Sequence, residues 1–289
     1  MSQVPVSKFH SYGNDFILVS AGDLPESSYS AFARDVCEAH FGLGGDGCLF
    51  IQMRSETLFR IWQFNRDGSE FGMSGNGVRS AAAFARHKSL TRASRSDFET
   101  RSGLKRYELL EEKNGDTWSF RSFMGEPDFA PSVISTLSPD QEEVLDDYPL
   151  GLEDRTVQIN GVWVGNPQCV LIVDHLPDED EFHRLGASLE VHPFFPERTN
   201  VSFVRREDDK RVSVRIWERG VGPTFSSGTG SCGAAVTAIR KGIVRSPVEV
   251  ATETGTQIVE WSPGEEIVLT GASVWIADAV FNWRPLHRA

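Results

Sequence analysis

Short apolar runs bounded by glycine, asparagine and aspartate recur along the whole chain, and this pattern is typical of β-strands. In the first half we expect strands at residues 7–10, 16–20, 48–53, 57–64, 105–110 and 117–123. In the second half we expect them at residues 169–173, 201–205, 211–217, 248–252, 257–261, 266–270 and 273–282. Four longer stretches predict helices, at residues 29–40, 76–88, 179–191 and directly after Gly230.

The two halves repeat one order of elements, and each contains a helix rich in small apolar residues. A segment at residues 125–154, rich in proline and acidic residues, shows no sustained period, so we interpret it as the connection between the halves. Turns are expected at residues 113–116 and, as a hairpin, at Asn160-Gly161. The expected domains are residues 1–130 and 131–289, with the last strand packing back on the first domain.

A four-residue motif occurs once in each half, as Ser-Gly-Asn-Gly at residues 74–77 and as Ser-Gly-Thr-Gly at residues 227–230, 153 positions later. Each copy opens one of the helices rich in small apolar residues. A glycine-rich helix start presents unpaired N–H groups at the positive end of the helix dipole, which bind carboxylates and phosphates. Two such ends that face each other could hold one anionic group from both sides.

Further polar positions repeat at the same offset, which chance matches of short strings would not produce. Asn65 and Glu218 each lie nine residues before their serine, and Gly47 corresponds to Asn200. Asn14 corresponds to Asn166 at an offset of 152. This register predicts a pseudo-symmetric pocket with one site shared by the halves, although glycine and asparagine also mark ordinary turns.

Composition narrows the function. A length of 289 residues is enough for two domains of ordinary size. The net charge of -12 argues against nucleic acid or an anionic membrane surface as the partner and favours a small molecule. No run approaches 18 apolar residues, and the first residues lack the order of a signal peptide, so a cytoplasmic protein without a membrane span is expected. The four cysteines have neither disulfide-framework nor metal-site spacing, so no metal is expected.

Motifs that span nearly the whole chain resemble the diaminopimelate epimerase family. They are the segments at residues 8–16, 64–70, 75–77, 165–169, 195–200, 217–220 and 228–230, in the family's order. The resemblance implies an α/β (α+β) fold of two pseudo-symmetric domains. In that family each domain is a curved mixed sheet wrapped round a central helix, and the active site lies in the cleft between the domains, so the same arrangement is expected here. It also implies an amino-acid substrate, no cofactor and no metal, and it leaves a homodimer open.

The resemblance also assigns site residues. The family's catalytic pair of cysteines, one in each half, falls on Ser74 and Ser227. Its substrate-binding positions fall on Asn14, Asn65, Gly75, Asn76, Asn166, Asn200, Glu218, Arg219, Gly228 and Thr229. Two further positions depart from the family, because a glutamine is replaced by Gly47 and a histidine by Gln168.

The serines change the chemistry. Forming an alkoxide costs on the order of 10 kcal/mol more than forming a thiolate at a helix start, so a neighbour must take the proton. Glu218 is the best remaining ionisable group for that role, and its alternative role is to anchor the substrate amine. We therefore expect an isomerase acting on an amino acid such as LL- or meso-diaminopimelate, with altered activity. A catalytically silent amino-acid-binding protein, or an elimination or proton-shift enzyme using Glu218 or Glu70, are the alternatives.

Overall fold

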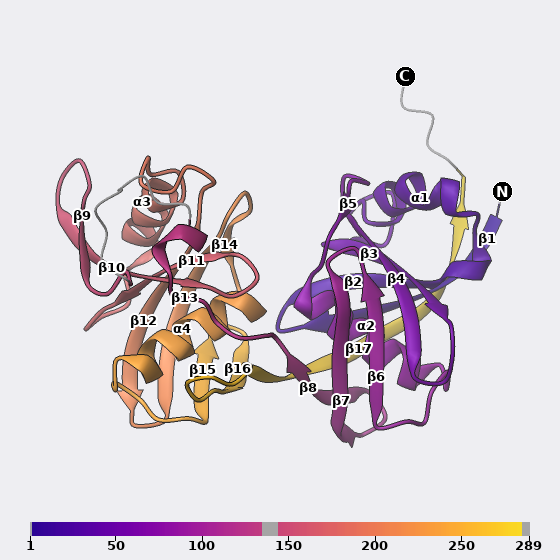
Figure 1. Cartoon of the computed structure of the whole chain (residues 1–289). Coiled ribbons are helices and arrows are strands. Elements are labelled where there is room, and N and C mark those ends of the chain that lie inside the picture. Colours follow the sequence, from indigo (N-terminus) through magenta and orange to yellow (C-terminus); the bar gives the residue numbers. More distant parts are fainter. Residues whose placement is uncertain (1, 135–143, 285–289) are drawn as a thin grey trace. The chain divides into compact units, whose positions relative to one another are not determined.

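The computed structural model describes residues 2–134 and 144–284, and these form two compact units (Figure 1). The first unit comprises Met1–Ser122 and Gly271–Ala289, and the second comprises Phe123–Thr270. The long last strand β17 (Val268–Trp283) contributes its first residues to the second unit and the rest to the first. The domain limits of 1–130 and 131–289 stay a prediction.

The elements of the first unit come in the order β1, β2, α1, β3, β4, β5, α2, β6, β7 and β8, with two short 3-10 turns, η1 and η2. Their bounds are β1 (Ser2–Ser11), β2 (Asn14–Ser20), η1 (Ala21–Asp23), η2 (Glu26–Ser28), α1 (Tyr29–Val36), β3 (Gly47–Met53), β4 (Leu58–Asn65), β5 (Glu70–Phe71), α2 (Gly75–His87), β6 (Arg95–Thr100), β7 (Gly103–Lys113) and β8 (Thr117–Phe123).

The second unit follows with η3 (Pro131–Val133), β9 (Tyr148–Gly151), β10 (Thr156–Trp163), β11 (Pro167–Ile172), α3 (Glu179–Glu190), β12 (Asn200–Asp208), β13 (Arg211–Glu218), β14 (Gly222–Thr224), α4 (Gly228–Arg240), β15 (Val248–Thr252) and β16 (Gly255–Glu260).

Strand pairing is the same in the two units. In the first, β2 runs parallel to β3, β3 antiparallel to β4, and β4 parallel to β6. In the second, β11 runs parallel to β12, β12 antiparallel to β13, and β13 parallel to β15. The repeated motifs therefore belong to a repeated mixed sheet, and the predicted α+β fold with two similar halves is confirmed.

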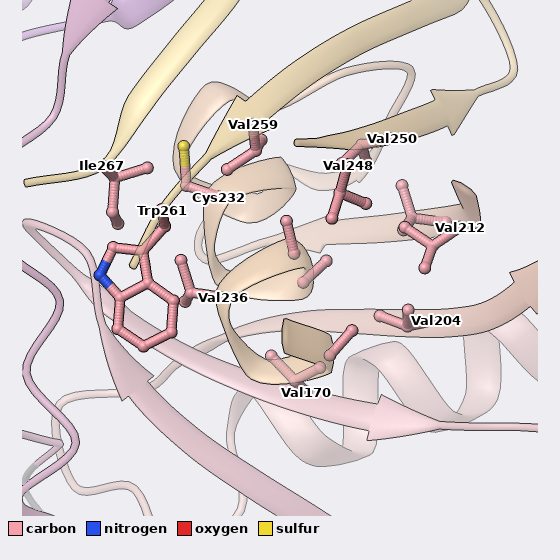
Figure 2. Close-up of a cluster of buried hydrophobic side chains, with 14 of the residues drawn as sticks. Val170, Val204, Val212, Cys232, Val236, Val248, Val250, Val259, Trp261 and Ile267 are labelled. Carbon is pink, nitrogen blue, oxygen red and sulfur yellow. The ribbon is translucent and has the colours of Figure 1, made fainter. Parts of the chain in front are cut away.

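One helix lies at the centre of each unit. All residues of α2 from Asn76 to Ala85 are buried, and α4 is buried over nearly its whole length. Alanine, glycine and serine dominate both helices, because small side chains let the surrounding strands approach closely. Figure 2 shows the apolar side chains that surround α4, with Val170 and Val204 on one side and Val250 and Val259 on another.

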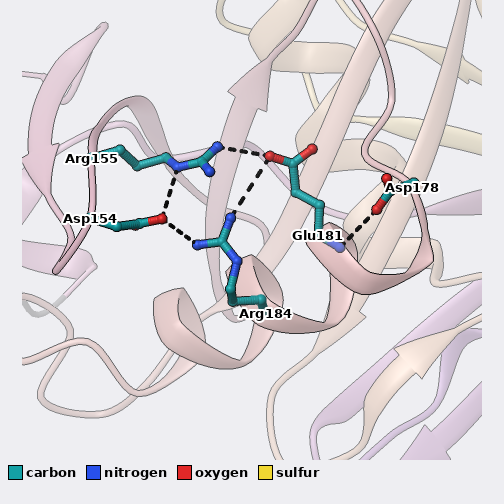
Figure 3. A network of polar contacts seen from close by, with 5 residues as sticks. All are labelled: Asp154, Arg155, Asp178, Glu181 and Arg184. Atoms are coloured by element: carbon teal, nitrogen blue, oxygen red, sulfur yellow. Dashed lines mark hydrogen bonds and ion pairs between the residues drawn. The ribbon is translucent and has the colours of Figure 1, made fainter.

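A second helix covers the outer face of each sheet, so the strands between the two helices are buried on both faces. In β3, Leu49 and Ile51 pack with α2, whereas Cys48 and Phe50 pack with α1. In the second unit α3 takes the outer position. Its first turn is capped by Asp178 and tied to the chain before β10 by the ion pair between Arg155 and Glu181, at 2.8 Å (Figure 3).

Several expected boundaries were wrong. The hairpin predicted at Asn160-Gly161 lies inside the continuous strand β10, and the chain turns at Gly165 instead, where φ is +70°. Gly161 is buried against Ile134 and Leu145, with no room for a Cβ atom, so this glycine serves packing and not a turn.

Other differences concern element lengths. The first helix ends at Val36 and not at residue 40, β6 was missed, and the two last strands are one, β17. The segment read as a connection at 125–154 contains η3 and β9. Its residues 135–143 lie outside the described residues.

Asp278 of β17 holds the last strand to the first unit. Its carboxylate accepts hydrogen bonds from Ser7 at 2.6 Å and from His87 at 3.0 Å, and it pairs with Lys88 at 2.9 Å. Against the opposing effect of burial, these contacts hold the pKa of Asp278 far below its ordinary value of 3.8. The ionised carboxylate therefore stabilises the folded state.

We predict that Asp278→Asn lowers the free energy of unfolding by about 1 kcal/mol at pH 7, a modest value because the carboxylate is partly exposed and screened. A depressed folded-state pKa gives stability that is present above the unfolded pKa and lost as pH falls through the folded one. The gap between wild type and variant should thus be full at pH 7 and shrink below about pH 4 in urea titrations. Glu56→Gln, on an exposed loop, is the control. A gap that does not change with pH would contradict this account.

Candidate active site at two helix starts

Ser74 and Ser227 occupy the same structural position, the N-cap of a buried central helix. Ser74 Oγ accepts a hydrogen bond from the Gly77 N–H at 3.1 Å, and Ser227 Oγ accepts one from the Gly230 N–H at 3.2 Å. Both serines have extended backbones, with φ and ψ of -118° and 124° for Ser74 and -126° and 128° for Ser227. Each hydroxyl therefore lies where N–H groups and the helix dipole favour negative charge.

Glycine at the third helical position brings each helix start onto its sheet. A Cβ on Gly77 would lie 2.9 Å from the Gln63 side chain, and a Cβ on Gly230 would lie 3.0 Å from Ile216. Gln63 and Ile216 occupy corresponding places in β4 and β13. The motif's glycine spacing therefore allows each helix start to pack closely against its sheet.

Glu218, at the end of β13, is the ionisable partner of Ser227. Burial raises the pKa of Glu218 above its ordinary value, and hydrogen bonds from Ser227 and Thr224 partly offset this rise. Ser227 Oγ also lies 3.5 Å from Thr229 Oγ1. A carboxylate with a raised pKa that is hydrogen-bonded to a hydroxyl at a helix start is suited to proton transfer.

Ser74 has different neighbours. Its backbone N–H donates to Gln63 Oε1 at 3.2 Å, and the residue that corresponds to Glu218 is the exposed, neutral Asn65. The Asn65 amide donates to Ser69 Oγ at 2.9 Å. The two serines therefore share a backbone geometry but differ in their access to a base.

Asn14 and Asn76 lie together in the first unit. Asn76 Nδ2 donates to Asn14 Oδ1 at 3.4 Å, Asn14 Nδ2 donates to Asp46 Oδ2 at 2.7 Å, and Arg79 donates to Asn76 Oδ1 at 2.8 Å. Gly75, in the same helix turn, accepts a hydrogen bond from the Tyr107 hydroxyl through its carbonyl. Asp46 also lines a cavity of about 490 Å³ with Arg34, Asp15 and Arg66.

Asn166, Asn200 and Arg219 lie together in the second unit. Asn200 donates to the Pro167 carbonyl and accepts from the Arg219 N–H, at 3.0 and 2.9 Å, so its amide fixes the backbone before Arg219. The exposed Arg219 side chain donates to the Glu197 carbonyl at 2.9 Å. Asn166 contacts the buried Gln168 side chain at 2.6 Å, and Gln168 fits over Gly233 of α4.

Three candidate residues were not singled out from the sequence: Gln63, Thr224 and Arg79. Arg79 lies two positions after the Ser-Gly-Asn-Gly motif, but its counterpart in the second half is Cys232, so the repeat gave no signal for it. Glu70, weighed as an acid or base, is paired with Arg101 at 3.2 Å. Gly47 has no space for a side chain in its present backbone position, since a Cβ would lie 2.8 Å from the Phe64 carbonyl.

Within residues 2–134 and 144–284, no three histidine, cysteine or acidic side chains are grouped as metal ligands. Over the same ranges, no helix is both long and apolar enough to cross a membrane.

Solved structures share this fold. A phenazine biosynthesis protein of the PhzF family from Bacillus anthracis matches with a TM-score of 0.68 and 16% identity, over 97% of this chain and 99% of its own. A hydroxyproline epimerase from Agrobacterium vitis, with bound trans-4-hydroxy-L-proline, matches with a TM-score of 0.66 and 14% identity, over 97% and 91%. At these identities, the likeness concerns the fold alone.

Relatives found by sequence share a higher identity with this chain than these solved structures do. A diaminopimelate epimerase from Caldanaerobacter subterraneus subsp. tengcongensis is 37% identical over 92% of this chain and 94% of its own length. One from Acinetobacter baumannii is 35% identical over 96% and 97%. The family model described as diaminopimelate epimerase matches residues 6–130 and 161–276. With its doubled fold and two capped helix starts, the chain thus belongs to the diaminopimelate epimerase family of isomerases.

Proposed function

We propose that this protein removes the α-proton of an amino acid such as LL- or meso-diaminopimelate without a cofactor, and that the two halves of the chain act on one substrate. The observation that carries the proposal is the pair of serine-capped helix starts. At one of them, the Ser227 hydroxyl donates a hydrogen bond to the Glu218 carboxylate. The name of the relatives supports the choice of substrate.

Proton removal is assigned to the Glu218 and Ser227 pair. In this scheme the Ser227 oxygen takes the α-proton while its own proton passes to the Glu218 carboxylate, so no free alkoxide forms. N–H groups at the starts of α2 and α4 stabilise the charge that develops on the substrate carboxylate. Arg219, Asn166 and Asn200 bind or orient the rest of the amino acid.

Return of the proton to the opposite face is assigned to Ser74. Because the position equivalent to Glu218 is Asn65, a proton given up by Ser74 leaves an alkoxide beside neutral groups. That step is costly, so we propose that exchange on the Ser227 face is faster than inversion. The same asymmetry favours a second candidate function, a proton shift or elimination run by Glu218 alone.

Incubation with meso-diaminopimelate in D2O tests the main proposal. We predict that deuterium enters the α-position faster than the stereocentre inverts, as followed by mass spectrometry and chiral chromatography. Glu218→Gln should reduce exchange by on the order of 10²-fold or more, the range for loss of a general base. Equal rates of exchange and inversion would contradict the assigned asymmetry. No exchange with any free amino acid, despite binding, would favour the silent binding protein, and loss of water or ammonia would favour elimination.

A second prediction concerns the serines. Ser74→Cys combined with Ser227→Cys should raise the inversion rate by on the order of 10²-fold or more, because helix starts lower the thiol pKa and each face gains an acid or base. Either single variant should gain much less. The matched control is Ser226→Cys, because Ser226 is a buried serine that does not cap either helix. A double variant that remains unable to invert any substrate would show that the pocket has been remodelled for another reaction.

A third prediction concerns Glu218. Its raised pKa means that the base form appears as pH rises through that value, so the exchange rate should rise over the same range. Ser227→Ala removes a hydrogen bond that lowers the pKa, so the Glu218 titration should move to higher pH in carboxyl-carbon NMR. Ser74→Ala is the matched control, since it removes the equivalent helix cap without touching Glu218. A Glu218 titration that is the same in both variants would contradict the assigned bond.

A further inference from the structure

Three hydrogen bonds join four side chains of the first unit in one line. Arg79 donates to Asn76 at 2.8 Å, Asn76 donates to Asn14 at 3.4 Å, and Asn14 donates to Asp46 at 2.7 Å. The two middle members are asparagines assigned to the substrate site. The two ends have no assigned role in the proposed reaction.

The ends determine the direction of the whole line. A guanidinium group only donates hydrogen bonds and a carboxylate only accepts them, whereas an amide can do either after a half-turn. With Arg79 at one end and Asp46 at the other, each asparagine has one orientation that satisfies both neighbours. The reversed line would place an amide N–H against Arg79 and an amide oxygen against Asp46.

Both ends are held firmly. Arg79 is fully buried, and its guanidinium lies against Gly271 of β17, where a Cβ would come within 2.9 Å of Cζ. Asp46 is held by Asp15, with hydrogen bonds in both directions between the two residues, and Asp15 forms an ion pair with Lys8 at 2.7 Å. The line is therefore anchored to the sheet at one end and to the loop before β3 at the other.

Burying Arg79 is costly, and among the described residues its Nε and Nη2 atoms have no hydrogen-bond partner. The corresponding residue of α4 is Cys232, so the second unit forms its helix start without such a charge. Packing of a central helix thus does not require an arginine at this place. Through Nη1 the Arg79 guanidinium donates a hydrogen bond to Asn76, at the start of α2.

We propose that Arg79 and Asp46 are positioning residues that hold Asn14 and Asn76 in one orientation, so that these amides meet an anionic group of the ligand with a fixed pattern of donors and acceptors. The inference rests on the proposed function for the nature of that ligand. The orientation of the Asn14 and Asn76 amides is inferred independently of the proposed function.

The test replaces each end by an amide that can both donate and accept. In a single variant, the unchanged end of the line still determines the orientation of the two asparagine amides. Arg79→Gln and Asp46→Asn should therefore each weaken binding of meso-diaminopimelate by only about twofold to threefold in calorimetry. The double variant loses both constraints and should bind at least about thirtyfold more weakly, which is more than the product of the single effects. Arg79→Lys, which keeps a donor-only end, should restore binding when combined with Asp46→Asn. Asp116→Asn, in a turn of the same unit, is the control.

Side-chain amide spectra of the ligand-free proteins provide the second readout, and thermal unfolding confirms that each variant folds. Asn14 and Asn76 should each give one pair of amide proton signals in the wild type and single variants, and two sets or broadened signals in the double variant. Single sets throughout, with multiplicative binding effects, would overturn the inference. If the wild type binds and exchanges no amino acid, the proposed function and the ligand part of this inference fail together, while the amide spectra still decide whether the two ends hold the asparagines.

Discussion

The hydrogen bond from a glycine N–H to a serine hydroxyl, made once at each central helix, is the interaction on which the structure of the site depends. It sets where α2 and α4 begin, and with the glycines at 77 and 230 it brings each helix start against a strand of its sheet. Serine is among the best residues for such a cap, so it suits both helix starts. A serine hydroxyl at such a helix start is far harder to ionise than a cysteine thiol would be.

The two halves share this frame but differ in charge. Ser227 has a carboxylate partner in Glu218, whereas the equivalent place near Ser74 belongs to Asn65. Conversely, α2 carries a buried arginine where α4 carries Cys232. The negative Glu218 beside the start of α4 is suited to proton removal. The positive Arg79 of α2 is suited to holding amide side chains in one orientation. The duplication therefore explains the fold, and its departures from symmetry explain the chemistry that we propose.

Much of the fold could be predicted because its signals are local. A serine followed by two glycines and a run of small apolar residues defines a capped, buried helix. The helix α2 begins one residue before its expected place, and α4 begins three residues before its own. The hairpin prediction at Asn160-Gly161 was wrong because glycine occurs both in tight turns and where packing leaves no room for a side chain. At Gly161 the second reason applies, because the Ile134 and Leu145 side chains occupy the space that a Cβ atom would need. Arg79 could not be identified for a similar reason, since its environment is completed by Gly271 at the far end of the chain. The pairing of Glu218 with Ser227 could be predicted from the sequence, because both residues lie at positions that repeat in the two halves of the chain.

We propose that the two serine-capped helix starts act on one substrate carbon. The most direct test is a crystal structure of the protein with meso-diaminopimelate bound. We expect one ligand molecule whose α-carbon lies within about 3.5 Å of both serine hydroxyls, with its carboxylate against the N–H groups that begin α2 and α4. A ligand bound at one helix start alone, or away from both, would contradict it.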